Sequence, residues 1–388
     1  MKVSPFSWNE RENLLFGVLA VLGAGCFVGG LLVNAERAWA AYLVGYFFWL
    51  CIGLAGVFFA ALQHITGSMW SATVRRVAES FIAFLPVAVV LFVVLLFGLH
   101  HLYEWTHADV VAADPVISQK TAYLNIPFFA IRGVVLFALC LGLGGWMVRN
   151  SLKQDKTGDV ALTHKNVRIS APFLLIFAWA FTFVAFDLMM SLSPRWFSTI
   201  FGVYCWAGLF YSGLAMITIW VIILRKRGVL GGFVTEDHLH DLGKLMFAFL
   251  VFWAYIGFSQ FMLIWYANLP EETFYMIRRI HGAWEPVSLA LMIGKFGLPF
   301  FMIVSRKAKR NENWLLFMAC WFLAAQWLDV YWMVYPTFFA TPVFGWMEIG
   351  IFAGFGGLFF LSVGAFLKRI SPVAIKDPRL NEALHHHQ

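Results

Sequence analysis

The chain has 388 residues, of which 61% are hydrophobic, 18% aromatic and 13% charged. Soluble domains carry about 25% charged residues, so this composition excludes a soluble protein and predicts an all-α polytopic membrane protein. The net charge of +7 would favour nucleic-acid binding in a soluble chain. In a membrane protein it reflects the charge of the loops, and no nucleic-acid partner is expected.

Apolar runs long enough to span a bilayer recur along the whole chain. One crossing needs about 20 mainly apolar residues, so we expect ten transmembrane helices in a single integral membrane domain, residues 1–388. The first run has no small-residue cleavage site after it, which predicts a retained helix. The expected helices cover Leu14–Val33, Ala41–Leu62, Phe81–Gly98, Ile126–Val148, Ala171–Met190, Ser198–Leu224, Leu245–Ala267, Pro286–Val304, Trp314–Tyr335 and Gly345–Leu367.

The distribution of Lys and Arg predicts the orientation. Cytoplasmic loops of membrane proteins carry an excess of these residues. Most of the 28 Lys and Arg residues, beginning with Lys2, fall in segments that share a side with both termini. We therefore expect both termini to be cytoplasmic. The few cations of the outer segments are Arg37, Lys120, Arg195, Arg278 and Arg279.

Two local patterns predict how segments pack. The stretch HITGSMWSATVRRVAES, residues 64–80, is a candidate interfacial helix on the inner side of the membrane. Two GxxxG pairs, Gly25 with Gly29 and Gly350 with Gly354, are typical of helices that approach each other closely.

Ionisable side chains interrupt the expected helices. Arg132 and Asp187 lie in the fourth and fifth helices, and Lys295 and Asp329 in the eighth and ninth. An ionised group in hydrocarbon costs at least about 2.5 kcal/mol, so four of them predict a shared polar interior. Either Asp187 pairs with Arg132 and Asp329 with Lys295 only to hold helices together, or the four belong to a chain of protonatable groups open to one or both sides of the membrane. The proton-transfer candidates are Asp187, Asp329, Lys295, Arg132, Gln260, Gln326 and Glu348.

A weak internal repeat relates the fifth and ninth helices. Asp187 stands seven residues before Pro194, and Asp329 seven residues before Pro336. Both helices run outward in the expected topology, so each proline is predicted to end its helix at the outer surface. Duplicated helix groups are common in membrane proteins, and coincidence explains this match equally well.

Three outer segments bring His, Glu, Arg and Trp towards one surface. Trp at a membrane interface is ordinarily an anchor. His and Glu beside aromatic rings also suit a quinone head group, whose carbonyl groups need a donor and a proton acceptor while the ring stacks. Both interpretations stay open. The quinol-pocket candidates are His100, Glu104, Arg195, Trp196, His281 and Glu285.

The histidine and cysteine patterns predict no cofactor in this chain. No histidine lies in the middle of an expected helix, which makes an intramembrane bis-histidine haem improbable. The five cysteines occur singly in apolar segments, without a CxxC or CxxCH motif. We expect no metal ligand and no catalytic residue.

The run FDLMMSLSPRWFSTIFGVY, Phe186–Tyr204, carries a resemblance to a known family. Over its whole length the chain resembles the NrfD/PsrC-like integral membrane subunits, and among them the ActF-like subunits of bacterial alternative complex III. That complex is a quinol:cytochrome c (or other periplasmic acceptor) oxidoreductase. The resemblance implies two four-helix bundles, residues 41–190 and 198–335, with flanking helices, in the bacterial inner membrane.

The same resemblance implies a function. It suggests a cofactor-free subunit, not catalytic alone, with a polar half-channel for proton transfer coupled to oxidation of menaquinol or ubiquinol. Asp187 and Asp329 would carry protons in the two bundles, with Arg132 and Lys295 tuning their pKa values. Haem c and iron–sulfur clusters would belong to its partners, which are an ActC-like paralogue, an iron–sulfur subunit and cytochrome c subunits.

Two other functions are compatible with the sequence. An independent secondary transporter would place a substrate site at the midplane between two helix bundles, and the Gly- and Pro-containing stretch GKFGLP in the eighth helix is typical of broken transporter helices. A purely structural membrane anchor would need no polar interior.

Overall fold

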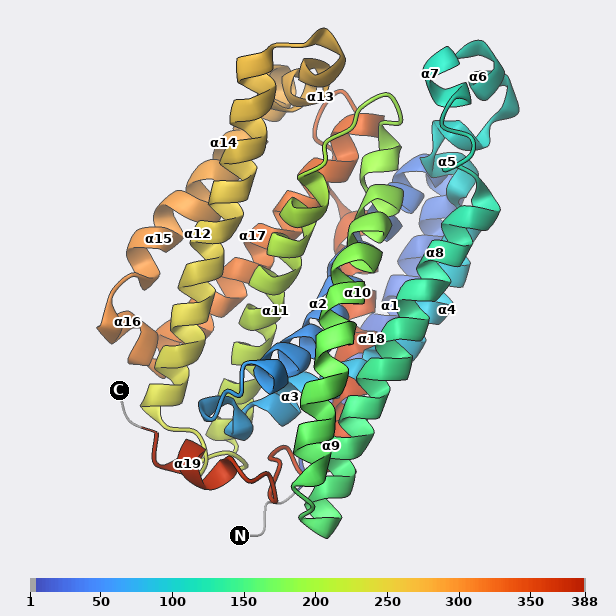
Figure 1. The fold of residues 1–388 in the computed structure, drawn as a ribbon. Coiled ribbons are helices and arrows are strands. Elements are labelled where there is room, and N and C mark those ends of the chain that lie inside the picture. Colours follow the sequence, from blue (N-terminus) through green and yellow to red (C-terminus); the bar gives the residue numbers. More distant parts are fainter. Residues whose placement is uncertain (1–4, 387–388) are drawn as a thin grey trace.

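The computed structural model describes residues 5–386, and all regular secondary structure in this range is helical. Ten segments of it are long and apolar enough to cross a membrane, which confirms the predicted all-α multi-pass architecture. Figure 1 shows these segments running side by side. Lys2, one of the predicted inner cations, lies outside the described residues.

Seven of the spanning segments are continuous α-helices. They are α1 (Glu10–Val33), α2 (Ala35–Ile65), α10 (Ala161–Leu188), α11 (Phe201–Lys226), α12 (Glu236–Ala267), α17 (Glu312–Phe338) and α18 (Trp346–Leu367). Several extend beyond their apolar run, because polar residues continue the helix outside the hydrocarbon. The expected inner loop between the fourth and fifth helices is therefore mostly helix.

The other three spanning segments combine different helix types. The third spanning segment consists of α3 (Arg75–Glu79), η2 (Ser80–Phe84) and α4 (Leu85–Leu96). The fourth consists of α8 (Ile126–Leu139), η4 (Cys140–Gly144) and α9 (Gly145–Thr157). The eighth consists of η6 (Gly282–Trp284), α14 (Glu285–Leu291), η7 (Met292–Gly297) and α15 (Leu298–Ile303). Both η4 and η7 are π-helices. The shorter helices are η1 (Trp70–Thr73), α5 (Leu99–Leu102), η3 (Glu104–Thr106), α6 (Ala108–Ala113), α7 (Pro115–Ser118), η5 (Met190–Leu192), α13 (Pro270–Ile280), α16 (Arg306–Arg310) and α19 (Leu380–Leu384).

The helices form two four-helix bundles with α1 and α18 on the flank. The first bundle contains α2, α4, α8 with α9, and α10, and the second contains α11, α12, α14 with α15, and α17. The bundles meet where α2 packs against α11 and α17. Because α2 and α11 lie in the centre, both helices are almost completely buried in protein. Their apolar side chains therefore contact other helices and not lipid.

Small residues form the contact between α1 and α18. A Cβ on Gly23 would overlap the backbone of Gly354, and one on Gly350 would overlap Cys26. The predicted role of the Gly350–Gly354 pair is therefore confirmed. The prediction for the Gly25–Gly29 pair is wrong, because a Cβ on Gly25 would meet no atom within 4 Å, whereas Gly23 of α1 is the glycine that contacts Gly354.

The predicted interfacial helix, residues 64–80, is exposed only in its first part, for example at Ile65 and Met69, whereas residues 71–80 are buried. Arg75, Arg76 and Glu79 are at most 1% exposed, because α3 packs inside the molecule against α2. Arg76 Nε lies 2.8 Å from Glu79 Oε2, and Asp155 and Asp377 pair with Arg76 and Arg75 respectively. These ion pairs neutralise the buried charges and so lower the cost of burying them. The sequence alone does not show that Asp155 and Asp377 reach this segment.

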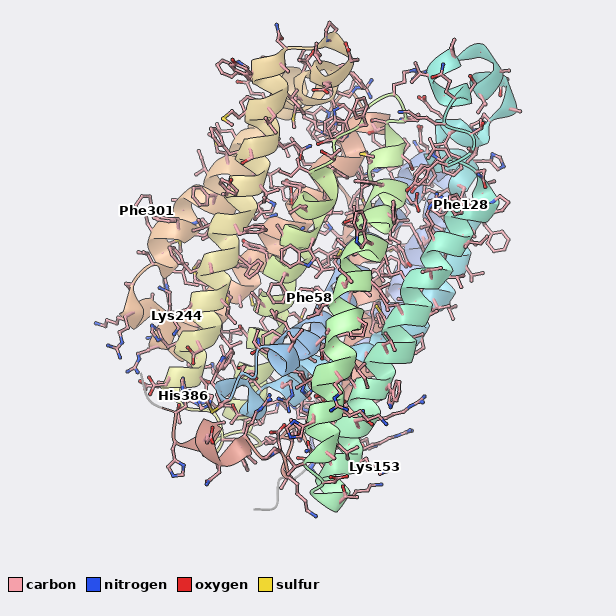
Figure 2. All side chains as sticks on the ribbon, in the orientation of Figure 1. Phe58, Phe128, Lys153, Lys244, Phe301 and His386 are labelled. Atoms are coloured by element: carbon pink, nitrogen blue, oxygen red, sulfur yellow. The ribbon has the colours of Figure 1, made fainter. Side chains whose placement is uncertain are left out.

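The exposed side chains separate an apolar belt from two polar ends. Phe128 and Phe301 project from opposite sides of the molecule, with 40% and 77% exposure, whereas Lys153, Lys244 and His386 lie in the lower half of the view (Figure 2). The lower end also holds α19, and a hydrogen bond joins Phe6 N–H to the carbonyl of Leu367. The first and last described segments therefore share one end, here called the terminal end.

The two prolines of the repeat end their helices differently. Pro194 lies beyond the end of α10 at Leu188, as predicted, but Pro336 is inside the last turns of α17, which continues to Phe338. Pro336 cannot donate to the carbonyl of Trp332. The buried Arg279 donates instead, to the carbonyl oxygens of Trp332 at 3.3 Å and Met333 at 2.8 Å.

Candidate functional site

A buried ion pair lies in the second bundle. Lys295 Nζ is 2.6 Å from Asp329 Oδ2, and the two side chains are 0% and 1% exposed. Lys295 also donates to Oε1 of Gln326 at 2.7 Å. Gln326 and Asp329 are one turn apart on α17, so both face Lys295 in the π-helix η7. The pairing of Asp329 with Lys295 is as the sequence predicted.

Two aromatic donors complete the hydrogen bonding of Asp329. The hydroxyl of Tyr204 on α11 donates to Oδ1 at 2.5 Å, and the indole N–H of Trp253 on α12 donates to Oδ2 at 3.2 Å. The Trp253 ring also lies 3.8 Å from Lys295 Nζ, a cation–π contact. All four helices of the second bundle thus contribute to one satisfied polar cluster.

The first bundle holds a corresponding pair. Arg132 on α8 donates through Nε and Nη2 to the two oxygens of Asp187 on α10, at 2.5 and 2.7 Å. Its guanidinium carbon lies 4.0 Å from the Tyr123 ring centre and 4.2 Å from that of Phe128. Burial and the Asp187 carboxylate raise the pKa of Tyr123, so this phenol stays protonated.

The two ion pairs come from corresponding helices of their bundles, although Lys295 lies inside its π-helix and Arg132 precedes its own. Each cation comes from the third helix of its bundle and each carboxylate from the fourth. Both cation-bearing helices contain a π-helical turn, with Gly145 N–H bonded to Cys140 O in one and Leu298 N–H bonded to Ile293 O in the other. The repeat suggested by the Asp–Pro spacing therefore extends to the ion pairs and the helix type.

The remaining proton-transfer candidates lie apart from these pairs. Glu348 accepts two hydrogen bonds of 2.8 Å from Arg37 and one of 2.6 Å from the hydroxyl of Tyr335. It also accepts from Gly345 N–H at the start of α18, so it caps that helix. Gln260 is buried on α12 in the wall of a cavity.

That cavity has a volume of about 840 Å³ and lies against the Asp329 cluster. Tyr204 and Trp253, both donors to Asp329, belong to its wall together with Gln260. Tyr255 and Phe258 also line it and are each 63% exposed, so it opens on the apolar belt. A mainly apolar cleft with a few polar groups is typical of a small-molecule site.

The quinol-pocket candidates do not converge on one point. Arg195 pairs with Glu104 at 3.0 Å and with Asp114 at 2.6 Å, at the end opposite to the terminal end and beside the first bundle. His100 is exposed nearby on α5. None of these three side chains lines the cavity, and the ring of His100 contacts His107 and not the Arg195 ion pairs.

The other candidates lie on the side of the second bundle. Trp196 is buried and stacks on Tyr275 of α13, with ring centres 3.8 Å apart and planes inclined by 10°. His281 is exposed after α13, and Glu285 begins α14. Glu285 lines the cavity, and Trp196 lies behind its wall, against the wall residues Tyr275 and Phe201. Of the six candidates, Glu285 alone is a wall residue.

Sequence reasoning missed the aromatic side chains that surround the two ion pairs. Tyr204, Trp253 and Tyr123 are common residue types in membrane helices, and nothing distinguishes them until the helices pack. Tyr204 closes the recognisable run Phe186–Tyr204, which was the one available signal. Within residues 5–386, no three His, Cys, Asp or Glu side chains converge as a metal site requires.

The fold and the site define a multi-pass α-helical membrane protein with two buried, hydrogen-bonded ion pairs, each between the third and fourth helices of a four-helix bundle. No protein-family model matches the chain, and no curated protein matches it.

Proposed function

We propose that the chain is a cofactor-free subunit of a quinol-oxidising respiratory complex in the bacterial inner membrane, similar to the ActF-like subunits of alternative complex III. In this proposal it supplies a polar half-channel for protons. Menaquinol or ubiquinol is oxidised with release of two protons and two electrons. The electrons pass to iron–sulfur and cytochrome c partner subunits beside an ActC-like paralogue, and both termini are cytoplasmic.

One observation carries the proposal: a belt-side cavity lies directly against a buried carboxylate. The cavity reaches Asp329 through Tyr204 and Trp253, which line it and donate to Asp329. A lipid-soluble ring entering from the membrane would meet hydroxyl, amide and carboxyl groups of Tyr204, Gln260 and Glu285. Such groups exchange protons or orient a quinol hydroxyl.

The two buried ion pairs are better explained by a role in proton transfer than by a role in helix packing alone. Replacement of a buried ion pair by apolar residues is often neutral or stabilising, so packing alone does not require one. Here Asp329 accepts hydrogen bonds from Lys295, Tyr204 and Trp253, and Asp187 accepts two from Arg132, so each carboxylate is held in place. A carboxylate so held can accept a proton when charge changes nearby.

The test uses Asp187→Asn and Asp329→Asn in the intact complex, with Asp159→Asn, an exposed position, as control. Haem and iron contents establish assembly, and proton release per electron is measured in proteoliposomes. We expect both buried variants to assemble and to lose proton coupling or turnover, and the control to retain both. If the Asp187→Asn and Asp329→Asn complexes assemble and release as many protons per electron as the wild type, at the same turnover, the proposal is contradicted.

A secondary transporter is the second candidate, and the π-helix η7 favours it. Lys295 lies inside this turn, in a helix that also contains Pro299. Irregular helices carrying a charge near the midplane are typical of transporters. Purification distinguishes the two functions, because a transporter is active alone, whereas a complex subunit copurifies with haem and iron–sulfur partners.

A further inference from the structure

A second cavity, of about 690 Å³, lies at the terminal end between the fourth and fifth spanning segments. It is separate from both ion pairs and was not anticipated from the sequence. Its wall comes from η4, α9 and α10. The lining residues are Leu143, Trp146, Ala161, His164, Lys165, Arg168, Ile169 and Pro172.

The lining changes from basic to apolar along α10. Lys165 and Arg168 are exposed on the part of the helix nearer the terminal end, and Ile169 and Pro172 follow deeper in the membrane direction. Positions three and four apart share one helix face, so the change occurs along a single track. Arg168 lies about 10 Å from the start of α10 at 1.5 Å per residue.

The apolar track continues beyond the cavity. Leu175 and Trp179 are 66% and 64% exposed on α10 at the next helical spacings after Pro172. The track therefore runs from cations at the end of the helix into the apolar belt. Trp146 stands beside the cations, with Lys165 Nζ 4.8 Å from its ring centre, as is usual for Trp at a membrane interface.

The cations of this cavity are not neutralised by the protein. Among residues 5–386, neither Lys165 nor Arg168 has an Asp or Glu within ion-pair distance. Arg76, also near this end, pairs with both Glu79 and Asp155. Two cations without an acidic partner lie at one end of an apolar track. This arrangement is complementary to a molecule that has an anionic head group and a hydrocarbon tail.

We infer that this cavity binds an anionic phospholipid of the leaflet at the terminal end. The phosphate lies at Lys165 and Arg168, and an acyl chain follows Leu143, Ile169 and Pro172 towards Trp179. The apolar track selects a lipid over free phosphate, since an inorganic anion leaves that surface uncovered. Basic pockets between transmembrane helices bind anionic lipid head groups in this way. The inference does not depend on the proposed function.

Photo-crosslinking tests it on the full chain in its native assembly. The protein is reconstituted in phosphatidylcholine nanodiscs containing phosphatidylglycerol with a diazirine on one acyl chain, and crosslinked peptides are identified by mass spectrometry. We expect crosslinks in Leu143–Trp146 and Ile169–Trp179. The double variant K165Q/R168Q should reduce them about 25-fold, at the strength expected for two interfacial cations.

Three comparisons make the test specific. K153Q/K156Q, which removes the same charge from exposed positions of α9, should leave crosslinking unchanged, and the charge-preserving K165R/R168K should retain it. Unlabelled phosphatidylglycerol should compete, whereas inorganic phosphate and phosphatidylcholine should not. Equal crosslinking in K165Q/R168Q, an equal loss in K153Q/K156Q, or competition by phosphate would each overturn the inference.

Discussion

Lys295 and Asp329 form an ion pair in which neither side chain is more than 1% exposed. Arg132 and Asp187 form its equivalent in the other bundle, with 8% and 3% exposure. Each pair joins the third and fourth helices of its bundle, so the two halves of the molecule place a buried ion pair between corresponding helices. The halves differ in their surroundings, since the second pair alone adjoins the 840 Å³ cavity.

The first prediction concerns the coupling within the second pair. Lys295→Met leaves Asp329 buried without its cation, which should cost about 3 to 5 kcal/mol of stability. The double variant K295M/D329L removes both charges and should recover most of this loss. Thermal unfolding in detergent measures the cycle. A double variant as unstable as the sum of the two single variants would contradict the coupling.

The second prediction concerns Gly208, which faces Gln326. A Cβ at residue 208 would lie 2.7 Å from Nε2 of Gln326, so Gly208→Ala should displace that side chain from Lys295. We expect Gly208→Ala to destabilise the wild-type protein. In the Gln326→Ala background it should instead stabilise by up to about 1 kcal/mol, because Ala is the better helix former.

Unfolding midpoints of the four proteins test this reversal of sign. Gly25→Ala is the matched control, since no atom lies within 4 Å of its Cβ position. It should be harmless in both backgrounds. The same sign for Gly208→Ala in both backgrounds would show that residue 208 does not act through Gln326.

The third prediction concerns the end of α17. Arg279→Met should be destabilising, because it removes the donor to the carbonyl oxygen of Trp332, which has no helical donor at Pro336, and a second hydrogen bond to Met333. Burial lowers the pKa of Arg279 to about 10, so the group is still charged at neutral pH. Pro336→Ala restores a backbone N–H to Trp332 and should reduce the cost of Arg279→Met.

Arg278→Met is the control for this experiment. Arg278 is exposed next to the buried Arg279, so its loss should change the unfolding midpoint little. Equal effects of Arg278→Met and Arg279→Met, or no rescue by Pro336→Ala, would count against the proposed replacement of the missing hydrogen bond.

The fourth prediction is a pH dependence of the loop that carries α6 and α7. Desolvation raises the pKa of Asp114, but hydrogen bonds from Arg195 and from backbone N–H groups outweigh it and hold the pKa below 3.8. Because the folded-state pKa is the lower one, the pair stabilises the loop above pH 3.8 and loses this effect as pH falls through the folded-state pKa.

Hydrogen exchange of residues 108–118 provides the measurement. We expect protection at neutral pH that decreases in acid, and a lower, pH-independent protection in Asp114→Asn. Equal acid sensitivity in Asp114→Asn would assign the change to another group, for example to Glu104, the second partner of Arg195.

The sequence predicted the parts of the fold that depend on composition. Ten apolar runs gave ten spanning segments, and the buried Asp, Arg and Lys could be paired correctly because isolated charges are so costly in hydrocarbon. The outer ends were less predictable. His100, Glu104 and Arg195 separate from Glu285 because their distance depends on how the two bundles pack, which no local pattern encodes.

The partners of Asp329 were unpredictable for a related reason. Tyr204 and Trp253 come from different helices, and each occurs in a segment where aromatic residues are frequent. Their role depends on three-dimensional convergence on one carboxylate. The prediction for the Arg75–Glu79 segment was wrong for the same reason. Two cations and one anion on a short helix indicate a surface position, and only the packed structure brings Asp155 and Asp377 to them.

The π-helix η7 has a consequence for how Lys295 is aimed. Hydrogen bonds from residue i to i+5 make a wider turn than those of an α-helix, and the ladder then resumes in α15 with an angular offset. Shortening this turn by one residue would rotate the ammonium group away from Asp329 without altering a single charge. The geometry of that turn, as much as the chemistry of the lysine, sets where the positive charge lies.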